Sequence, residues 1–452
     1  MKKIFNIIAL LALAFATAGL TACSDYEEPA KKDKGKTPVV KYVRVCDPEK
    51  SDSLIVAASL GQKIAFVGDN LGDVQQIWFN DLKASINPNL VTSNVIIVDV
   101  PGVIAGEVTN TVRMITSTGI EITYPFEVTV PGPRILTANN EYTKPGEVMT
   151  LTGAYFVDDP NVPITVTFAN NLPAKIVTFD QSQMQVEVPE GAVEGPITIK
   201  TIYGEGQSPF YYRDSRGMIF DFSTHMPING TNGWHSAPIV DDEYAIAGPY
   251  ILLNGDGGNE MDAAGSTWNE EAFGYEYWPG GWTGGMDGDT DLGPIEYDAT
   301  SMRIDSWVDL INWENANLKF ELMIPKSNPW QAGGMQLIFT SSATVSLGRA
   351  GTSVDGYAMA GSNNNYFSAD NQPRAIYSPW SATEAFHTSD QWITVSIPMS
   401  EFRYTSQNTS CSTPMLIQDF AGMSLLVNAG GKEGVACSPI FRIDNVRIVN
   451  DL

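Results

Sequence analysis

The sequence predicts an all-β protein made of two tandem small β-sandwiches followed by a larger, jelly-roll-like β-sandwich. Several short segments alternate apolar and polar residues with the two-residue period of a half-buried strand, as Met184, Val186 and Val188 do. The 40 glycines and 27 prolines divide the chain into short units. Beyond the N-terminal leader, we find no long segment with the 3.6-residue period of a helix.

The N-terminal residues predict export and lipidation. Lys2 and Lys3 precede an apolar run over residues 4–20, which suits a signal peptide and is shorter than the ~20 residues of a membrane span. The run ends in Leu-Thr-Ala-Cys at residues 20–23, which looks like a bacterial lipobox. Residues 1–22 are then a signal peptide, and the thiol of Cys23 takes a diacylglyceryl group. The alternative is a plain secretory signal with a coincidental cysteine.

The residues that follow predict a tether on the outside of the cell. The acidic residues among 24–28 resemble the export tags of surface-exposed lipoproteins. Residues 29–38 hold four lysines and almost nothing apolar, so we expect residues 23–38 to form a flexible linker. No later run is apolar enough to span a bilayer, so we expect a lipid anchor in the outer membrane to be the only membrane attachment.

Two segments repeat one pattern and predict an internal duplication. Residues 61–71 and 146–156 each begin at a glycine, alternate through a short strand and turn at a second glycine seven residues later. Each is followed by an apolar strand that ends in proline, at Pro101 and Pro189. We expect two sandwiches of roughly 80 to 90 residues, over residues 39–130 and 131–213. The pattern resembles the immunoglobulin-like IPT/TIG domain.

The composition changes after residue 213 and predicts a third, larger domain over residues 214–452. Nine of the ten tryptophans lie beyond residue 220. Leu318, Phe320, Leu322 and Ile324 alternate with Lys319, Glu321 and Met323, as in a strand. The closing strand, residues 441–448, loses its apolar parity at Asp444-Asn445, as a β-bulge would cause.

Three aromatic clusters in this domain are flanked by glycine and proline, at residues 273–285, 328–334 and 373–380. We interpret them as loops, and we expect their aromatic rings not to be needed for packing the hydrophobic core. Indole and phenol rings stack on the apolar face of a sugar while their polar atoms reach its hydroxyl groups. The predicted glycan-binding residues are Tyr275, Trp278, Trp282, Trp330, Tyr377 and Trp380. Trp307, Trp313 and Trp392 alternate as in strands, and we assign them to the core or a sheet face.

The net charge of the protein restricts which class of ligand it is expected to bind. The formal net charge of −25 argues against nucleic acid and disfavours anionic glycans, which leaves a neutral polysaccharide as the expected ligand.

The sequence lacks a recognisable catalytic constellation. The three histidines are scattered, and the nearest approach to a jelly-roll glucanase motif, at residues 260–265, has glycine in place of the second glutamate. We therefore expect no enzyme activity, although a carboxylate pair from distant strands stays open. We expect no cofactor. The acidic residues 287–291 offer a structural calcium site as the less favoured alternative to a solvated turn. Cys411 and Cys437 allow a disulfide.

Taken together, these features resemble a known family, the multidomain "B" type of surface glycan-binding proteins of polysaccharide-utilisation systems. The resemblance covers nearly all of the mature chain: the lipobox, the tandem spacer domains, and terminal segments at residues 373–380, 391–398 and 443–447. It implies a β-glucan ligand such as xyloglucan or mixed-linkage glucan. It also implies action beside a TonB-dependent transporter and a companion lipoprotein. A jelly-roll glycoside hydrolase and a protein-binding surface adhesin are the alternatives.

Overall fold

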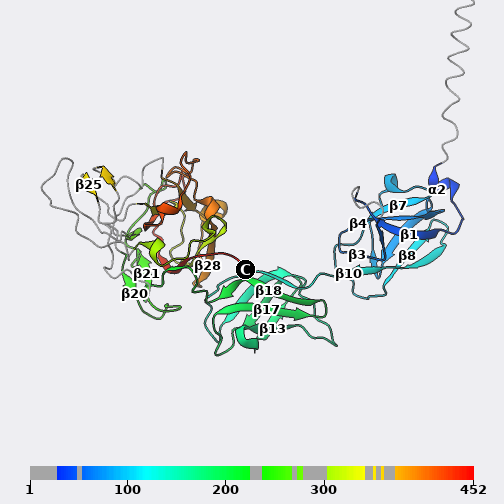
Figure 1. Cartoon of the computed structure of the whole chain (residues 1–452), viewed down its shortest axis with the longest axis horizontal. Coiled ribbons are helices and arrows are strands. Elements are labelled where there is room, and N and C mark those ends of the chain that lie inside the picture. The colour runs from blue at the N-terminus through cyan, green and yellow to red at the C-terminus, as the bar shows by residue number, and fades with distance from the viewer. Residues whose placement is uncertain are drawn as a thin grey trace, which may run out of the picture. The chain divides into compact units, whose positions relative to one another are not determined.

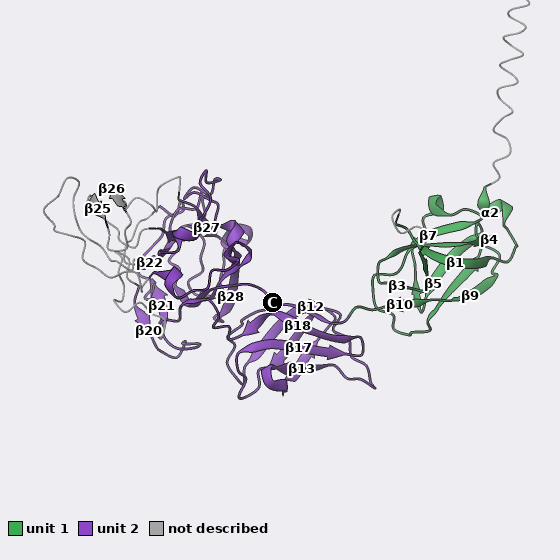
Figure 2. Cartoon of the chain, viewed as in Figure 1, with its two compact units in different colours: residues 1–131 green, residues 132–452 purple. Residues whose placement is uncertain are grey.

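The computed structural model describes residues 28–47, 53–223, 237–266, 272–277, 303–341, 350–352, 358–360 and 372–452. The chain forms two compact units, residues 1–131 and 132–452 (Figure 2). The described residues are nearly all strand and loop, with α-helices only at α2 (Pro29–Lys32) and α3 (Trp380–Thr383) (Figure 1). The predicted all-β class is therefore confirmed. None of these described helices has the length and apolarity needed to cross a membrane.

Unit 1 is a β-sandwich of two four-stranded sheets. Phe66, Phe79 and Phe126 meet in its core with ring centroids 6.0 to 6.2 Å apart. One sheet has the order β2-β1-β4-β7 and the other β6-β5-β8-β9, while β3 pairs in parallel with β10. The bounds are β1 Val39–Val45, β2 Leu54–Ile55, β3 Ala57–Ser59, β4 Lys63–Asp69, β5 Val74–Phe79, β6 Leu82–Lys83, the 3-10 turn Pro88–Leu90, β7 Val95–Asp99, β8 Thr111–Thr116, β9 Glu121–Pro125 and β10 Glu127–Thr129.

Unit 2 begins with a second sandwich of the same plan. Its sheets have the orders β11-β12-β16-β15 and β14-β13-β17-β18. The bounds are β11 Arg134–Ala138, β12 Val148–Ala154, β13 Thr165–Phe168, the 3-10 turn Ala169–Asn171, β14 Leu172–Pro173, β15 Lys175–Phe179, β16 Gln183–Glu187, β17 Gly195–Thr201 and β18 Gly204–Tyr212.

The repeated glycines have the same physical role in both sandwiches. Gly61 and Gly146 adopt the left-handed backbone, with φ of 72° and 83°, which glycine reaches without steric cost. At Gly68 and Gly153, a Cβ atom would collide with a backbone carbonyl of the neighbouring strand, that of Val39 or of Arg134. The duplication predicted from the sequence is thus present as matching turns and matching strand contacts.

The rest of unit 2 is a larger sandwich. One sheet has the order β20-β21-β30-β23-β28, with β19 also paired to β30, and the facing sheet is β22-β29-β24-β27. The bounds are β19 Met218–Phe220, β20 Ile239–Val240, β21 Tyr250–Leu253, β22 Gly274–Tyr277, β23 Asn317–Met323, β24 Met335–Thr340, β25 Ala350–Thr352, β26 Ala358–Ala360, β27 Arg374–Tyr377, β28 Ile393–Pro398, β29 Gly422–Val427 and β30 Phe441–Val449. Four 3-10 turns are described, Ile304–Ser306, Trp313–Asn315, Met399–Glu401 and Ile417–Asp419.

The predicted bulge in the last strand is confirmed. The register between β23 and β30 shifts between Lys319, which pairs with Arg447, and Glu321, which pairs with Asp444, so that β30 has one extra residue beside Asp444-Asn445. Asn445 has a φ of 51°, a left-handed conformation that asparagine tolerates better than most residues. The bulge puts Arg447 and Asp444, which are three residues apart, on the same face of the sheet, whereas a regular strand would put them on opposite faces.

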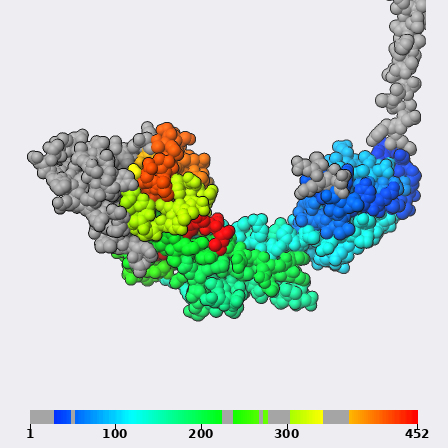
Figure 3. Space-filling model, viewed as in Figure 1, coloured from blue at the N-terminus to red at the C-terminus, as the bar shows by residue number. Residues whose placement is uncertain are grey.

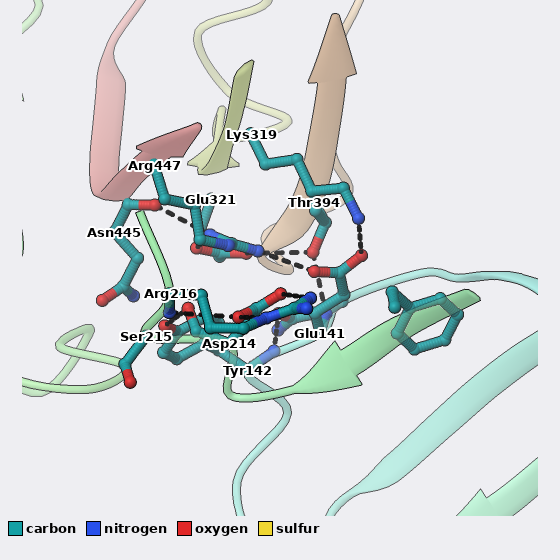
Figure 4. A network of polar contacts seen from close by, with 12 residues as sticks. Glu141, Tyr142, Asp214, Ser215, Arg216, Lys319, Glu321, Thr394, Asn445 and Arg447 are labelled. Carbon is teal, nitrogen blue, oxygen red and sulfur yellow. Dashed lines mark hydrogen bonds and ion pairs between the residues drawn. The ribbon is translucent and has the colours of Figure 1, made fainter. Parts of the chain in front are cut away.

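The two sandwiches of unit 2 are joined by buried charges (Figure 4). Arg447 of β30 donates to Glu321 of β23 at 2.9 Å and to Glu141 of the β11–β12 loop at 2.7 Å. Lys319 lies 2.8 Å from the other Glu141 oxygen, and Thr394 donates to Glu321 at 3.0 Å. These four charged side chains are at most 5% exposed. Two cations thus face two carboxylates, one of which comes from the other sandwich.

Further contacts lie at the same interface between the two sandwiches of unit 2, which we call the seam. The Arg447 guanidinium lies 5.0 Å from the centre of the Tyr142 ring, whose hydroxyl donates to the Asp214 carbonyl at 2.7 Å. The C-terminal residues, red in Figure 3, lie against the second sandwich, where the Leu452 amide donates to the Pro209 carbonyl at 2.8 Å. The second sandwich and the described part of the third therefore pack as one unit.

The segment expected to be a flexible linker differs from that expectation in its described part. Residues 29–32 form α2, and Asp33 is 1% exposed and accepts a hydrogen bond from the Gly72 amide at 3.0 Å. Composition alone did not reveal this contact because its partner, Gly72, lies in a turn 39 residues further along the chain.

We predict that Arg447→Met lowers the free energy of unfolding of unit 2 by about 3–5 kcal/mol, because it leaves two buried carboxylates without their shared cation. Urea unfolding measures this. The control is Lys175→Met, which removes an exposed pair with Glu187 and should leave the midpoint unchanged. A wild-type midpoint for Arg447→Met would show that the seam does not depend on this cation.

We also predict a pH dependence that originates at Asp444. Burial, with Glu321 and Asp221 nearby, raises the pKa of this carboxyl to about 8. The unfolded chain ionises near pH 4 while the folded chain stays protonated, so stability falls as pH rises from about 4 to 8. Asp444→Asn should flatten this part of the stability profile and raise the melting temperature most at pH 8. Identical profiles for both proteins would contradict the assignment.

Candidate functional site

The facing sheet β22-β29-β24-β27 organises the predicted site residues. β22 and β24 both run antiparallel to β29, so they end at the same edge of the sheet, beside Met423 and Gly422. β22 ends at Tyr277, and Trp278 is the next residue in the sequence. Tyr377 pairs with Met335 at the opposite edge, where β24 begins.

The structure brings three of the predicted aromatic residues together. Trp330, Tyr377 and Trp380 lie at the edge where β24 begins, and the rings of Trp330 and Tyr377 are 6.0 Å apart. Trp278, Trp282 and the predicted lipidation site Cys23 lie outside the described residues.

Trp330 and Trp380 are core residues and not the exposed loop aromatics that their glycine and proline neighbours led us to expect. Trp330 is 0% exposed, and its indole N–H donates to the carbonyls of Ala332 and Gly333 at 2.7 and 3.0 Å. Trp380 is 3% exposed and donates to the same Gly333 carbonyl at 2.7 Å. The two rings therefore hold the turn before β24 from the inside, and neither presents a face to solvent.

Tyr275 is also buried. The segment that begins at Phe273 was expected to be irregular, but its residues 274–277 form strand β22. Tyr275 is 3% exposed and packs edge-on against Phe220 and Phe222 at 5.7 and 5.6 Å. Burial raises the pKa of its hydroxyl. Tyr275, which was expected in an exposed loop, therefore belongs to the core between the two sheets.

Tyr377 is half-buried. Its ring lies 6.0 Å from that of Trp330 and 6.5 Å from that of Phe386, and burial raises its pKa to about 12. It is the one predicted ring among the described residues that keeps partial exposure. Trp307, Trp313 and Trp392 pack against hydrophobic clusters, as expected.

Sequence reasoning missed a row of polar groups on the face of this sheet that points away from the core. Glu276, Ser424 and Arg374 line up across the strands through Ile338, and each alternates with residues that pack inward. Arg374 also donates to Gln336 at 2.7 Å. The signal in the sequence is the polar residue between two aromatic ones, as in Tyr275-Glu276-Tyr277.

These polar groups offer both donors and acceptors, which suits sugar hydroxyl groups. They are at most 3% exposed, so in this conformation they support neighbouring groups and do not themselves form a surface.

The described residues contain no group of three or more His, Cys, Asp or Glu side chains that could hold a metal ion. The proposed calcium ligands at residues 287–291 lie outside the described residues, so that site stays a prediction. Asp262, in the segment nearest to a glucanase motif, accepts hydrogen bonds from Ser266 at 2.6 and 2.7 Å and closes a turn. Cys437 is a buried free thiol, so the disulfide with Cys411 that the sequence allows is not formed.

Comparison with known proteins shows which family the third sandwich resembles. Residues 212–450 match the family described as the surface glycan-binding protein B xyloglucan binding domain. The crystal structure of a surface glycan-binding protein B from Prevotella bryantii is 36% identical, with a TM-score of 0.75, over 92% of this chain and 99% of that one.

A second relative matches over a shorter stretch. An IPT/TIG domain-containing protein of Bacteroides ovatus is 28% identical over 258 residues, 51% of this chain. The chain spans about half the length of that relative.

We predict that Trp330→Ala lowers the free energy of unfolding of unit 2 by about 3–5 kcal/mol, because it opens a cavity and leaves backbone carbonyls without donors. Thermal unfolding measures this, and Tyr377→Phe, which keeps its ring, should melt like the wild type. If Trp330→Ala also melts like the wild type, the indole is not part of the core.

Proposed function

Because the chain belongs to the surface glycan-binding protein B family, we propose that it is a cell-surface lipoprotein that binds a neutral polysaccharide without hydrolysing it. The observation that carries the proposal is the family match over residues 212–450, which is the third sandwich. The relative from Prevotella bryantii extends the likeness over nearly the whole chain.

Xyloglucan is the favoured ligand in this proposal, and mixed-linkage β-glucan is the next candidate. The description of the matched domain names xyloglucan. Xyloglucan is uncharged, which agrees with the formal net charge of −25.

We assign ligand contact to Trp278 and Trp282, which follow β22 in the sequence. Stacked indole rings bind a sugar chain without any reactive group. The polar row of Glu276, Ser424 and Arg374 would help to orient the residues that contact the ligand. Tyr377, at the edge where β24 begins, is the candidate for a second contact with the same chain. Trp330, Trp380 and Tyr275 act in this proposal only by shaping the scaffold.

In the proposed cellular role, lipid on Cys23 anchors the protein to the outer membrane, and the domains at residues 39–130 and 131–213 separate the binding domain at residues 214–452 from the membrane. Captured glycan passes to a TonB-dependent transporter and its companion lipoprotein. Many anchored copies on one polymer raise the effective affinity of a modest single site.

Affinity electrophoresis of the chain without residues 1–23 tests the binding role, in gels that contain xyloglucan, mixed-linkage β-glucan, laminarin, galactomannan or starch. We expect retardation by xyloglucan and no release of reducing sugar from the same samples. No retardation by any glycan would favour a protein adhesin, and release of sugar would favour a hydrolase.

The paired variants Trp278→Ala and Trp282→Ala locate the site. Each should lose retention by the glycan and keep the wild-type melting temperature, because the proposal assigns these rings to contact with the ligand and not to the core. Retention equal to that of the wild type in the double variant would overturn the assignment of these rings.

A further inference from the structure

The N-terminal segment of unit 1 is fixed to the sandwich behind it. The Asp33 carboxylate accepts a hydrogen bond from the Gly72 amide at 3.0 Å, and the Asn70 side chain donates to the Thr37 carbonyl at 3.2 Å. Gly72 has no side chain at the point where Pro29 crosses it, and a Cβ there would collide with Pro29. The ordered protein therefore begins no later than Glu28.

This segment carries a concentration of positive charge that is unusual for the chain. Four exposed lysines lie within six residues, Lys31, Lys32, Lys34 and Lys36. The formal net charge of the whole protein is −25. Among the described residues, Glu28 lies 3.5 Å from Lys31 with both groups exposed, and the buried Asp33 lies 3.7 Å from Lys36. Counted over residues 28–36, four lysines and these two acids leave a surplus of two positive charges, and two further acids, Asp25 and Glu27, stand between this segment and Cys23 in the sequence.

The short stretch of chain between the lysine cluster and Cys23 limits how far the cluster can lie from the membrane. Five Cα steps separate Glu28 from Cys23, and even a fully extended chain covers about 18 Å over that distance. Lipid on Cys23 would therefore hold Glu28, three residues before the first lysine of the cluster, at most about 18 Å from the membrane surface, and a lysine interacts with that surface once it comes within about one Debye length, 8 to 10 Å.

We propose that the lysine cluster of residues 31–36 contacts the phosphate groups of the lipid surface and holds unit 1 against the membrane. The inference rests on the lipidation of Cys23 in the proposed function and goes beyond it. Acyl chains already make the attachment stable, and each lysine near an anionic surface adds about 1 kcal/mol. The cluster therefore sets the orientation of unit 1 and not the strength of anchoring.

The test uses the lipidated chain, purified from membranes and reconstituted into phosphatidylcholine vesicles with or without phosphatidylglycerol. Acetylation of individual lysines by an amine-reactive reagent is followed by mass spectrometry. We expect the cluster to react at least about fivefold more slowly in the anionic vesicles, which corresponds to about 1 kcal/mol per lysine. Lys175 and Lys200, exposed in unit 2, should react equally in both vesicles, and high salt should remove the difference.

A matched pair of variants separates the cluster from net charge. One replaces the four cluster lysines by glutamine, and the other replaces four exposed lysines elsewhere, Lys63, Lys175, Lys200 and Lys326. Hydrogen exchange of the amides of residues 31–37 should slow in anionic vesicles for the wild type and the second variant but not for the first. Equal exchange in both vesicle types for the wild type, or slowing that both variants retain, would overturn the proposal. An intact mass without acyl groups would instead overturn the lipidation of Cys23.

Discussion

Arg447 lies fully buried between two carboxylates that belong to different sandwiches, and the integrity of unit 2 depends on this arrangement. A guanidinium removed from water is tolerated only when its charge is compensated at hydrogen-bonding distance, and Glu321 and Glu141 both provide this. Lys319 balances the second carboxylate. Because Glu141 comes from the second sandwich, the third sandwich by itself would place two cations, Lys319 and Arg447, beside one carboxylate, Glu321. The second sandwich therefore completes the charge balance of the third.

The same physical logic explains why the aromatic residues divide between scaffold and candidate site. Indoles buried beside a turn can satisfy backbone carbonyls, which is how Trp330 and Trp380 both use Gly333. A ring used in this way has no free face for a sugar. Among the described candidates, only Tyr377 keeps partial exposure, at the edge of the sheet β22-β29-β24-β27 where β24 begins.

The fold could be predicted from the sequence wherever the determinant is local. Glycines seven residues apart marked both small sandwiches because each position has a backbone reason, a left-handed turn at Gly61 or a close strand at Gly68. The slip in parity at Asp444 marked the bulge. The buried tryptophans were misplaced because glycine and proline neighbours are the same in a buried turn as in an exposed one. β22 was missed because four residues are too few to show a period, and the docking of Asp33 because its partner is distant in sequence.

The seam also has a consequence for the order in which the protein can mature. Glu141 and Arg447 are separated by 306 residues, so their contact closes one of the longest loops in the chain. Domains generally fold as they emerge, beginning from the N-terminus. The second sandwich can therefore be complete while its partner for Glu141 has yet to be made or exported. During that interval the Glu141 carboxylate is exposed to water at the surface of a folded domain. It becomes buried only when β30, the last strand of the chain, packs against it.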